Sequence, residues 1–174
     1  MADPPQSAGA LSALTLELAA GLVADAAQRS VGEWDGAADA YVQALELARR
    51  SVVLGAINEE AYRGAVAALH GELVPAPRET RDAALGDMLD RAAEAPLALT
   101  KTAADVAVLA GHVGEHAPDQ AAADAVAAAA VATGVARATT HLVAVNLGTR
   151  EDDPRLYQAR REVRRATDAL PDGV

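Results

Sequence analysis

Two histidines and a glutamate, His112, Glu115 and His116, have spacing that suits metal chemistry. This H-x-x-E-H pattern places both imidazoles one helical turn apart, as in one class of zinc enzymes. However, Gly114 and Pro118 indicate that the segment lies at a helix end, where histidines complement the negative end of the helix dipole. So short a motif often matches by accident. The sequence therefore favours the helix-end interpretation and predicts no metal site.

Three further polar residues fall in one long apolar stretch, from Asp119 to Leu147. Asp124 lies one turn into it, where it either complements the helix dipole or serves a site. Arg137 and His141 are four residues apart and, at 100° per residue, lie on the opposite side from Asp124. Arg137 suits a ligand carboxylate or, equally, an internal acid. The two polar faces cannot both line one pocket in one subunit.

Lys101 lies in a mostly apolar segment, LALTKTAADV. Such a lysine usually extends its ammonium group to solvent, although in a cleft it could bind an acidic ligand. Trp34, Tyr41 and Tyr62 are too few for a stacking platform, so they are interpreted as core or interface residues.

The elements that must position these side chains are helices. The segment Asp119–Leu147 has no proline and is rich in alanine, the strongest helix former. Between Ala125 and Ala136 only Thr133 has a polar side chain. A helix that is apolar nearly all round must be covered by neighbours. The segment is therefore predicted to be a buried central helix with other helices on every side.

Apolar residues recur at helical spacing elsewhere, and no stretch alternates as a strand would. An optional break falls at residues 58–60. The fold class is therefore all-α, with about six helices in a single domain spanning residues 1–174. The other predicted helices run from Ser7 to about Ser30, from Asp35 to about Leu69, from Glu79 or Thr80 to about Glu94, from Pro96 to about His112, and from Arg155 to about Ala169.

The composition limits the partners and the compartment. A net charge of −10 disfavours nucleic acid, and the charged residues within the apolar runs argue against a membrane span. The chain has no cysteine, and its first residues lack the basic start of a signal peptide, so a cytoplasmic location is expected. Aromatic residues make up only 2%. A core of Ala, Leu and Val buries little area per residue, so a homodimer is expected to add the remainder.

Three segments, in this order and spacing, carry a family resemblance. They are a helix opening at Pro5–Leu14, the run Asn58–Tyr62, and the stretch from Ala123 to Leu147 with its Val-Asn-Leu end. Together they resemble the cyclodeaminase/cyclohydrolase family of folate enzymes. That family comprises the cyclodeaminase part of formiminotransferase-cyclodeaminase and bacterial methenyltetrahydrofolate cyclohydrolases. The resemblance implies a helical homodimer that acts on a tetrahydrofolate derivative without a metal.

The sequence departs from the family pattern at several site positions. The family's opening glycine triplet is reduced here to Gly9, and its acidic residue before Ala-aromatic is Asn58. The serine before Asp124 is Ala123, and a family asparagine aligns with Leu142. Gly9, Tyr62, Asp124 and Asn146 match the pattern. The scaffold therefore matches the family better than the site does.

By resemblance, Asp124 and Asn58 are the catalytic candidates, and Ser7, Gly9 and Tyr62 are expected to bind substrate, with Lys101 as a further substrate-binding candidate. Asp124 would be the only carboxylate left to move a proton. The expected activity is that of a methenyltetrahydrofolate cyclohydrolase or a formimidoyltetrahydrofolate cyclodeaminase. The alternative is a non-catalytic or repurposed homodimer that binds another small molecule or a partner enzyme.

Overall fold

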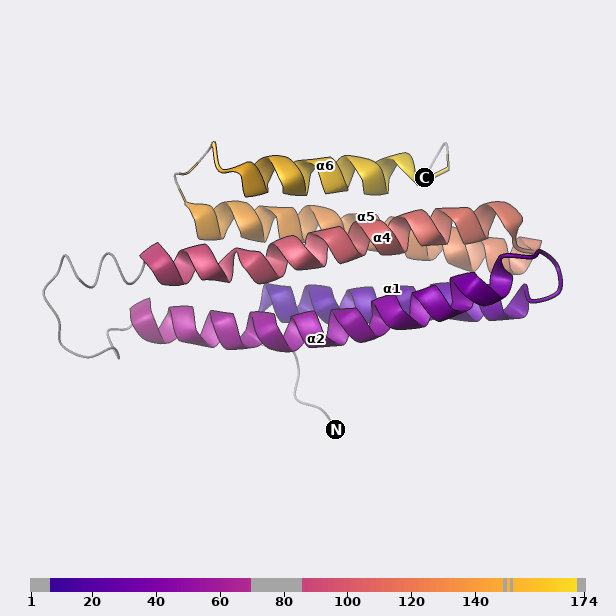
Figure 1. Cartoon of the computed structure of the whole chain (residues 1–174), viewed down its shortest axis with the longest axis horizontal. Coiled ribbons are helices and arrows are strands. Elements are labelled where there is room, and N and C mark those ends of the chain that lie inside the picture. The colour runs from indigo at the N-terminus through magenta and orange to yellow at the C-terminus, as the bar shows by residue number, and fades with distance from the viewer. Residues whose placement is uncertain (1–6, 70–85, 149, 151, 172–174) are drawn as a thin grey trace, which may run out of the picture.

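The protein is a bundle of long helices lying side by side (Figure 1), and a computed structural model describes residues 7–69, 86–148, 150 and 152–171. All-α architecture is confirmed, with no strand in the described segments. A further helical stretch covers residues 86–92, and the predicted connector after His70 and the helix start at Glu79 or Thr80 lie outside the described residues. The named helices are α1 (Ala8–Arg29), α2 (Ala37–Leu69), α4 (Glu94–His116), α5 (Asp119–Leu147) and α6 (Pro154–Asp168).

The first two helices form an antiparallel pair. The first predicted helix begins at Ser7, and Ser7 is the cap of α1, since its side chain accepts a hydrogen bond from the Ala10 amide at 3.1 Å. A turn containing Gly32, whose φ of +93° favours glycine, leads into α2. Helix α2 then runs for 33 residues without interruption. Residues 58–60 therefore do not break it, and Asn58 is a buried residue in mid-helix.

Helix α4 is longer at both ends than predicted. It begins at Glu94, so that Pro96 occupies the first turn, and it continues through Gly111 and Gly114 to His116. Neither glycine ends the helix, and both lie where another segment packs closely against α4. A Cβ at Gly111 would clash with the backbone oxygen of Ala169, and one at Gly114 would lie 3.0 Å from the Val126 side chain.

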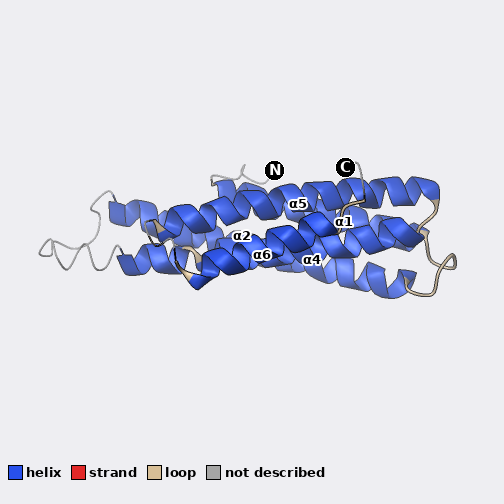
Figure 2. Ribbon diagram, turned by 90° about the horizontal axis from the view of Figure 1, so that it is seen from above, coloured by secondary structure: helices blue, strands red, loops and turns tan. Residues whose placement is uncertain are grey.

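Helix α5 is the central element, and it packs against α1, α4 and α6. Seen from above, these neighbours lie alongside it (Figure 2). The other helices of the same chain do not cover α5 on every side, contrary to the prediction. An exposed strip follows one face of α5. It is mostly small and apolar, with Ala123, Ala127, Val131, Gly134, Ala138 and Val145, and its second half also carries Arg137 and His141.

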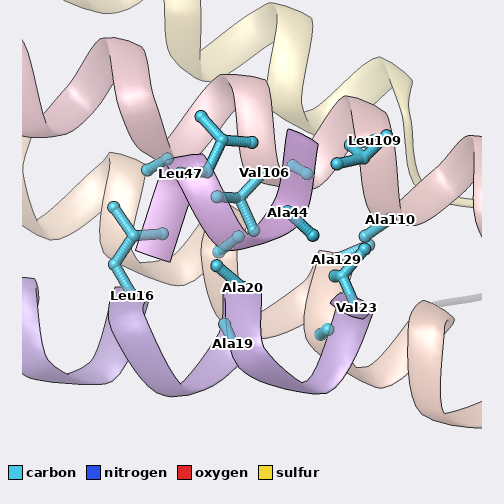
Figure 3. Close-up of a cluster of buried hydrophobic side chains, with 14 of the residues drawn as sticks. Leu16, Ala19, Ala20, Val23, Ala44, Leu47, Val106, Leu109, Ala110 and Ala129 are labelled. Carbon is cyan, nitrogen blue, oxygen red and sulfur yellow. The ribbon is translucent and has the colours of Figure 1, made fainter. Parts of the chain in front are cut away.

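The main core lies where α1, α2, α4 and α5 meet, and most of its members are alanine. Leu16, Val23 and Val106 are among its few larger, fully buried side chains, and they interdigitate with alanines from all four helices (Figure 3). The short side chains let the helices pack closely.

Helix α6 covers α4 and α5 and is fixed at its start by Arg155. Its guanidinium pairs with Asp90, with Glu94 at 2.9 Å and with Asp153 at 2.8 Å. The hydrogen bonds from Arg155 lower the pKa of Asp153 to about 2, and Asp153 also caps α6. This cluster joins the start of α6 to the start of α4.

By length and composition alone, α1 and α5 are apolar enough to cross a membrane. Half of the apolar window of α1 and 44% of that of α5 are buried inside the bundle. Core helices of globular proteins have the same properties, so this is weak support for a membrane span.

Candidate functional site

A cavity of about 190 Å³ lies where the start of α1, the middle of α2 and the end of α5 meet near Pro96 of α4. Four of the six residues predicted for the site line this cavity, namely Ser7, Gly9, Asn58 and Tyr62. Its wall is mostly apolar and carries a few polar side chains. The described lining comprises Ser7, Ala8, Gly9, Asn58, Ala61, Tyr62, Ala65, Ala92, Pro96, Leu142, Val145 and Asn146.

The Ser7 hydroxyl is the centre of the polar network at this cavity. It donates a hydrogen bond to Oε2 of Glu59 at 3.0 Å, and it accepts from the Ala10 amide and, at 3.4 Å, from Nδ2 of Asn58. The network joins the first turn of α1 to the middle of α2. The Ser7 hydroxyl is thus hydrogen-bonded directly to a carboxylate.

Gly9 lies directly against Asn58. A Cβ at Gly9 would overlap the Asn58 side-chain amide, which is only 7% exposed. The single glycine remaining in the opening turn therefore lets α2 bring an amide against the backbone of α1. Because the Asn58 side chain has no proton to release or take up near neutral pH, its chemistry here is hydrogen bonding.

The opposite wall comes from the last turns of α5. Nδ2 of Asn146 donates to the backbone oxygen of Ala92 at 2.8 Å, which fixes its amide beside the cavity. Leu142 places an apolar side chain on the same wall. Tyr62 is 46% exposed and lies at the rim, with its hydroxyl group available to a ligand.

Asp124 does not join this group within one chain. It lies 22 residues before Asn146 on α5, or about 33 Å away at 1.5 Å per residue. There it pairs with Arg29, which also pairs with Asp25 at 2.9 Å. The hydrogen bond that Arg29 donates to Asp124 raises the pKa of Arg29 above its usual value.

Three other polar candidates also lie away from the cavity. Lys101 is half-buried on α4 and is not among the residues that line it. Arg137 and His141 are exposed on α5, and Nη2 of Arg137 lies 3.5 Å from the Thr167 hydroxyl of α6.

Glu59 is the site residue that the sequence did not reveal. It follows Asn58 directly, so a one-residue shift of the family's acidic position would have identified it. Its carboxylate reaches Ser7 from the side rather than lining the cavity. The cavity thus presents an apolar surface, two amides, a phenol and the hydroxyl of Ser7, which is hydrogen-bonded to Glu59 outside the lining. This set suits a polar heterocycle whose reaction moves a proton.

Comparisons with known proteins agree with this fold. The crystal structure of formiminotetrahydrofolate cyclodeaminase from Thermotoga maritima is similar, with a TM-score of 0.70 and 19% sequence identity over 98% of this chain and 90% of that chain. At this identity the likeness shows the fold alone. A comparison with curated proteins gives no match.

A comparison with models of protein families places the chain in a family. The family model described as formiminotransferase-cyclodeaminase matches residues 2–165. This range includes both walls of the cavity, from Ser7 on α1 to Asn146 on α5. Since the match spans nearly the whole bundle and the cavity within it, the chain belongs to the formiminotransferase-cyclodeaminase family.

Proposed function

We propose that this protein is a folate-dependent one-carbon enzyme that acts at the bridge carbon of a reduced folate. One possible reaction expels ammonia from a formimino group and so closes the methenyl ring. The other adds water to the methenyl ring and so opens it. Family membership supports the substrate class. The observation that carries the proposal is the Ser7–Glu59 hydrogen bond at a cavity that also holds Asn58 and Tyr62.

Both of these reactions need a group that moves protons. In ring opening, water adds to the bridge carbon, one carbon–nitrogen bond breaks, and the departing nitrogen takes up a proton. In ring closure, the second folate nitrogen bonds to the formimino carbon and loses its proton, and the bond from that carbon to the amino group breaks as the amino group takes up a proton and leaves as ammonia. Glu59 acts as the acid or base through the Ser7 hydroxyl, while Asn58 and Tyr62 orient the heterocycle by hydrogen bonds.

The cavity of one chain is smaller than a folate requires. Small-molecule sites usually enclose roughly 300–1,000 Å³, and this cavity has about 190 Å³. Val145 and Leu11 are both exposed, Val145 at the cavity and Leu11 one turn beyond Ser7. We therefore propose that a second copy of the chain completes the site.

The exposed strip of α5 and its neighbour α1 provide a surface for that copy. Leu11, Leu14 and Leu18 are exposed on α1, which packs against α5. The two helices run antiparallel, since Arg29 pairs with Asp124 at one end and Ser7 and Asn146 line the same cavity at the other. A two-fold axis at the middle of this face would bring Asp124 of the partner subunit to the cavity end. Asp124 remains a catalytic candidate on that basis.

The alternative is a repurposed relative that binds a different small molecule or a partner enzyme. Two observations favour it. The Ser7 hydroxyl already has three hydrogen-bond partners, and Leu142 makes the wall apolar where the family has asparagine. Under either proposal we place the protein in the cytoplasm and off the membrane, and its net charge of −10 disfavours nucleic acid as a partner.

The direct test is turnover. Purified protein is incubated with methenyl-tetrahydrofolate and with formimino-tetrahydrofolate, and the methenyl absorbance is followed. The wild type is expected to change it in at least one assay, and Asp124→Asn is expected to abolish that activity if the dimer proposal holds. Turnover no faster than buffer, combined with no thermal stabilisation by folates, would exclude the enzyme and support the repurposed relative.

A further inference from the structure

We propose that His112, Glu115 and His116 bind a divalent transition-metal ion of the Zn²⁺ class at the far end of the bundle. The site is independent of the proposed folate chemistry. His112 lies 16 residues beyond Pro96 on α4, which separates it from the cavity by about 24 Å along the helix.

The donor atoms are already close together. One ligand atom from each of the three residues lies within 4.8 Å of the others. Because α4 remains helical through His116, positions 112, 115 and 116 share one face. Zinc bonds of about 2.0–2.1 Å place tetrahedral ligands roughly 3.3 Å apart. Ion binding would therefore draw donor atoms that are up to 4.8 Å apart closer together, by about 1.5 Å at most.

The ring orientation of His116 is fixed for metal binding. Its Nδ1 lies 2.9 Å from the backbone oxygen of His112. When Nδ1–H donates to this carbonyl, the lone pair of Nε2 is left for the ion. A histidine ligand held through its other nitrogen is the usual arrangement at metal sites.

Trp34 forms a wall against both imidazoles. Its ring centroid lies 5.0 Å from that of His116 in a stacked arrangement, and 5.2 Å from that of His112 edge to face. The two histidine rings lie 4.4 Å from each other. This packing, which the sequence could not reveal, restricts the rotamers of two ligands and so reduces the entropy lost when they bind an ion.

The chemistry of the donors selects the ion. Two imidazole nitrogens and one carboxylate oxygen suit Zn²⁺, Cu²⁺ and Ni²⁺ and are a poor set for Ca²⁺ or Mg²⁺. Three protein ligands leave a fourth position for water. The negative end of the helix dipole, which favours histidines at a helix C-terminus, also favours a cation at this last turn of α4.

The chain supplies its own reporter for a test. Trp34 is the only tryptophan, and it touches both histidines. Tag-free protein is titrated with NiCl₂ at pH 7.5 while tryptophan fluorescence is followed, and ZnCl₂ is then added as a competitor. We expect saturable quenching that Zn²⁺ reverses.

Variants separate the site from incidental binding. His116→Gln and Glu115→Gln are each expected to raise the midpoint for Ni²⁺ by about tenfold or more, equivalent to about 1.4 kcal/mol of binding free energy. The matched control His141→Gln removes an exposed histidine of α5 and is expected to leave the midpoint unchanged. Quenching that rises linearly without saturation would overturn the proposal, and so would equal midpoints in His116→Gln and wild type. Circular dichroism verifies that each variant is folded. Loss of folate turnover would not affect this result, since the readout is metal binding alone.

Discussion

The hydroxyl of Ser7 donates to Oε2 of Glu59 at 3.0 Å, across the junction between the first turn of α1 and the middle of α2. Ser7 is thus both the cap of one helix and the contact of a carboxylate on the next. The pair is 52 residues apart in the chain, so only the crossing of the two helices creates it.

Glu59→Gln tests whether this carboxylate moves the proton. The substitution keeps a hydrogen-bond acceptor for Ser7 and removes the acid–base function, so kcat is expected to fall by about 10²–10⁴. The control is Glu60→Gln, an exposed neighbour on α2 that is expected to keep wild-type kcat. Equal activity of Glu59→Gln and wild type would remove Glu59 from the mechanism.

Gly9→Ala tests the contact between α1 and α2. The added Cβ overlaps the buried Asn58 amide, so we expect a loss of about 1–3 kcal/mol of unfolding free energy, measured in urea. Gly21→Ala on the same helix meets no atom within 4 Å and is expected to stabilise by about 0.5–1 kcal/mol.

The cause of the Gly9→Ala defect can be verified by a double-mutant cycle. Combining Gly9→Ala with Asn58→Ala removes the overlapping amide, so part of the loss is expected to return as coupling energy. Additive effects of the two substitutions would place the cause elsewhere.

Leu18→Glu tests the proposed dimer surface. Leu18 is 66% exposed near the middle of the apolar face of α1, and a charge there opposes burial against a second copy. Light scattering coupled to size exclusion is expected to show a dimer for wild type and a monomer for Leu18→Glu. Val42→Glu is the matched control, because Val42 is 64% exposed on α2, away from that face. A monomeric wild type would contradict the proposal.

Asp153→Asn tests how Arg155 fixes the start of α6. The pKa of Asp153 is lowered from 3.8 to about 2, so the folded state favours the ionised form. This stabilisation is fully present above about pH 4 and is lost as the pH falls to about 2. Asparagine retains the helix cap but not the charge. The urea midpoint of Asp153→Asn is therefore expected to depend less on pH in that interval than wild type does, whereas Asp152→Asn should follow wild type.

Much of the fold follows from local signals. The cap at Ser7, the proline in the first turn of α4 and the unbroken apolar run of α5 are determined by neighbouring residues, and the structure contains each of them. The glycines of α4 are typical of a helix end, yet the helix continues through both of them. They lie where α5 and the end of α6 approach closely, a tertiary contact that does not alter the local sequence pattern.

The site was predictable only in part. Ser7, Gly9, Asn58 and Tyr62 meet at one cavity as the resemblance implied. The contact of Glu59 depends on how α1 crosses α2, which the local sequence does not show. The order of family motifs gives no distance along a helix, so it does not separate Asp124 from the other site residues. The stacking of Trp34 on His116 likewise joins segments that are distant in sequence.

The alanine-rich core has a consequence for how this protein tolerates sequence change. Most core positions carry a single methyl group, so truncation removes little, whereas any larger residue must displace a neighbouring helix. On the inner faces of the helices, the size of the new side chain therefore mainly decides whether a substitution is tolerated. The polar residues at the two ends of the bundle are not subject to this limit, so binding chemistry can change there while the scaffold stays constant.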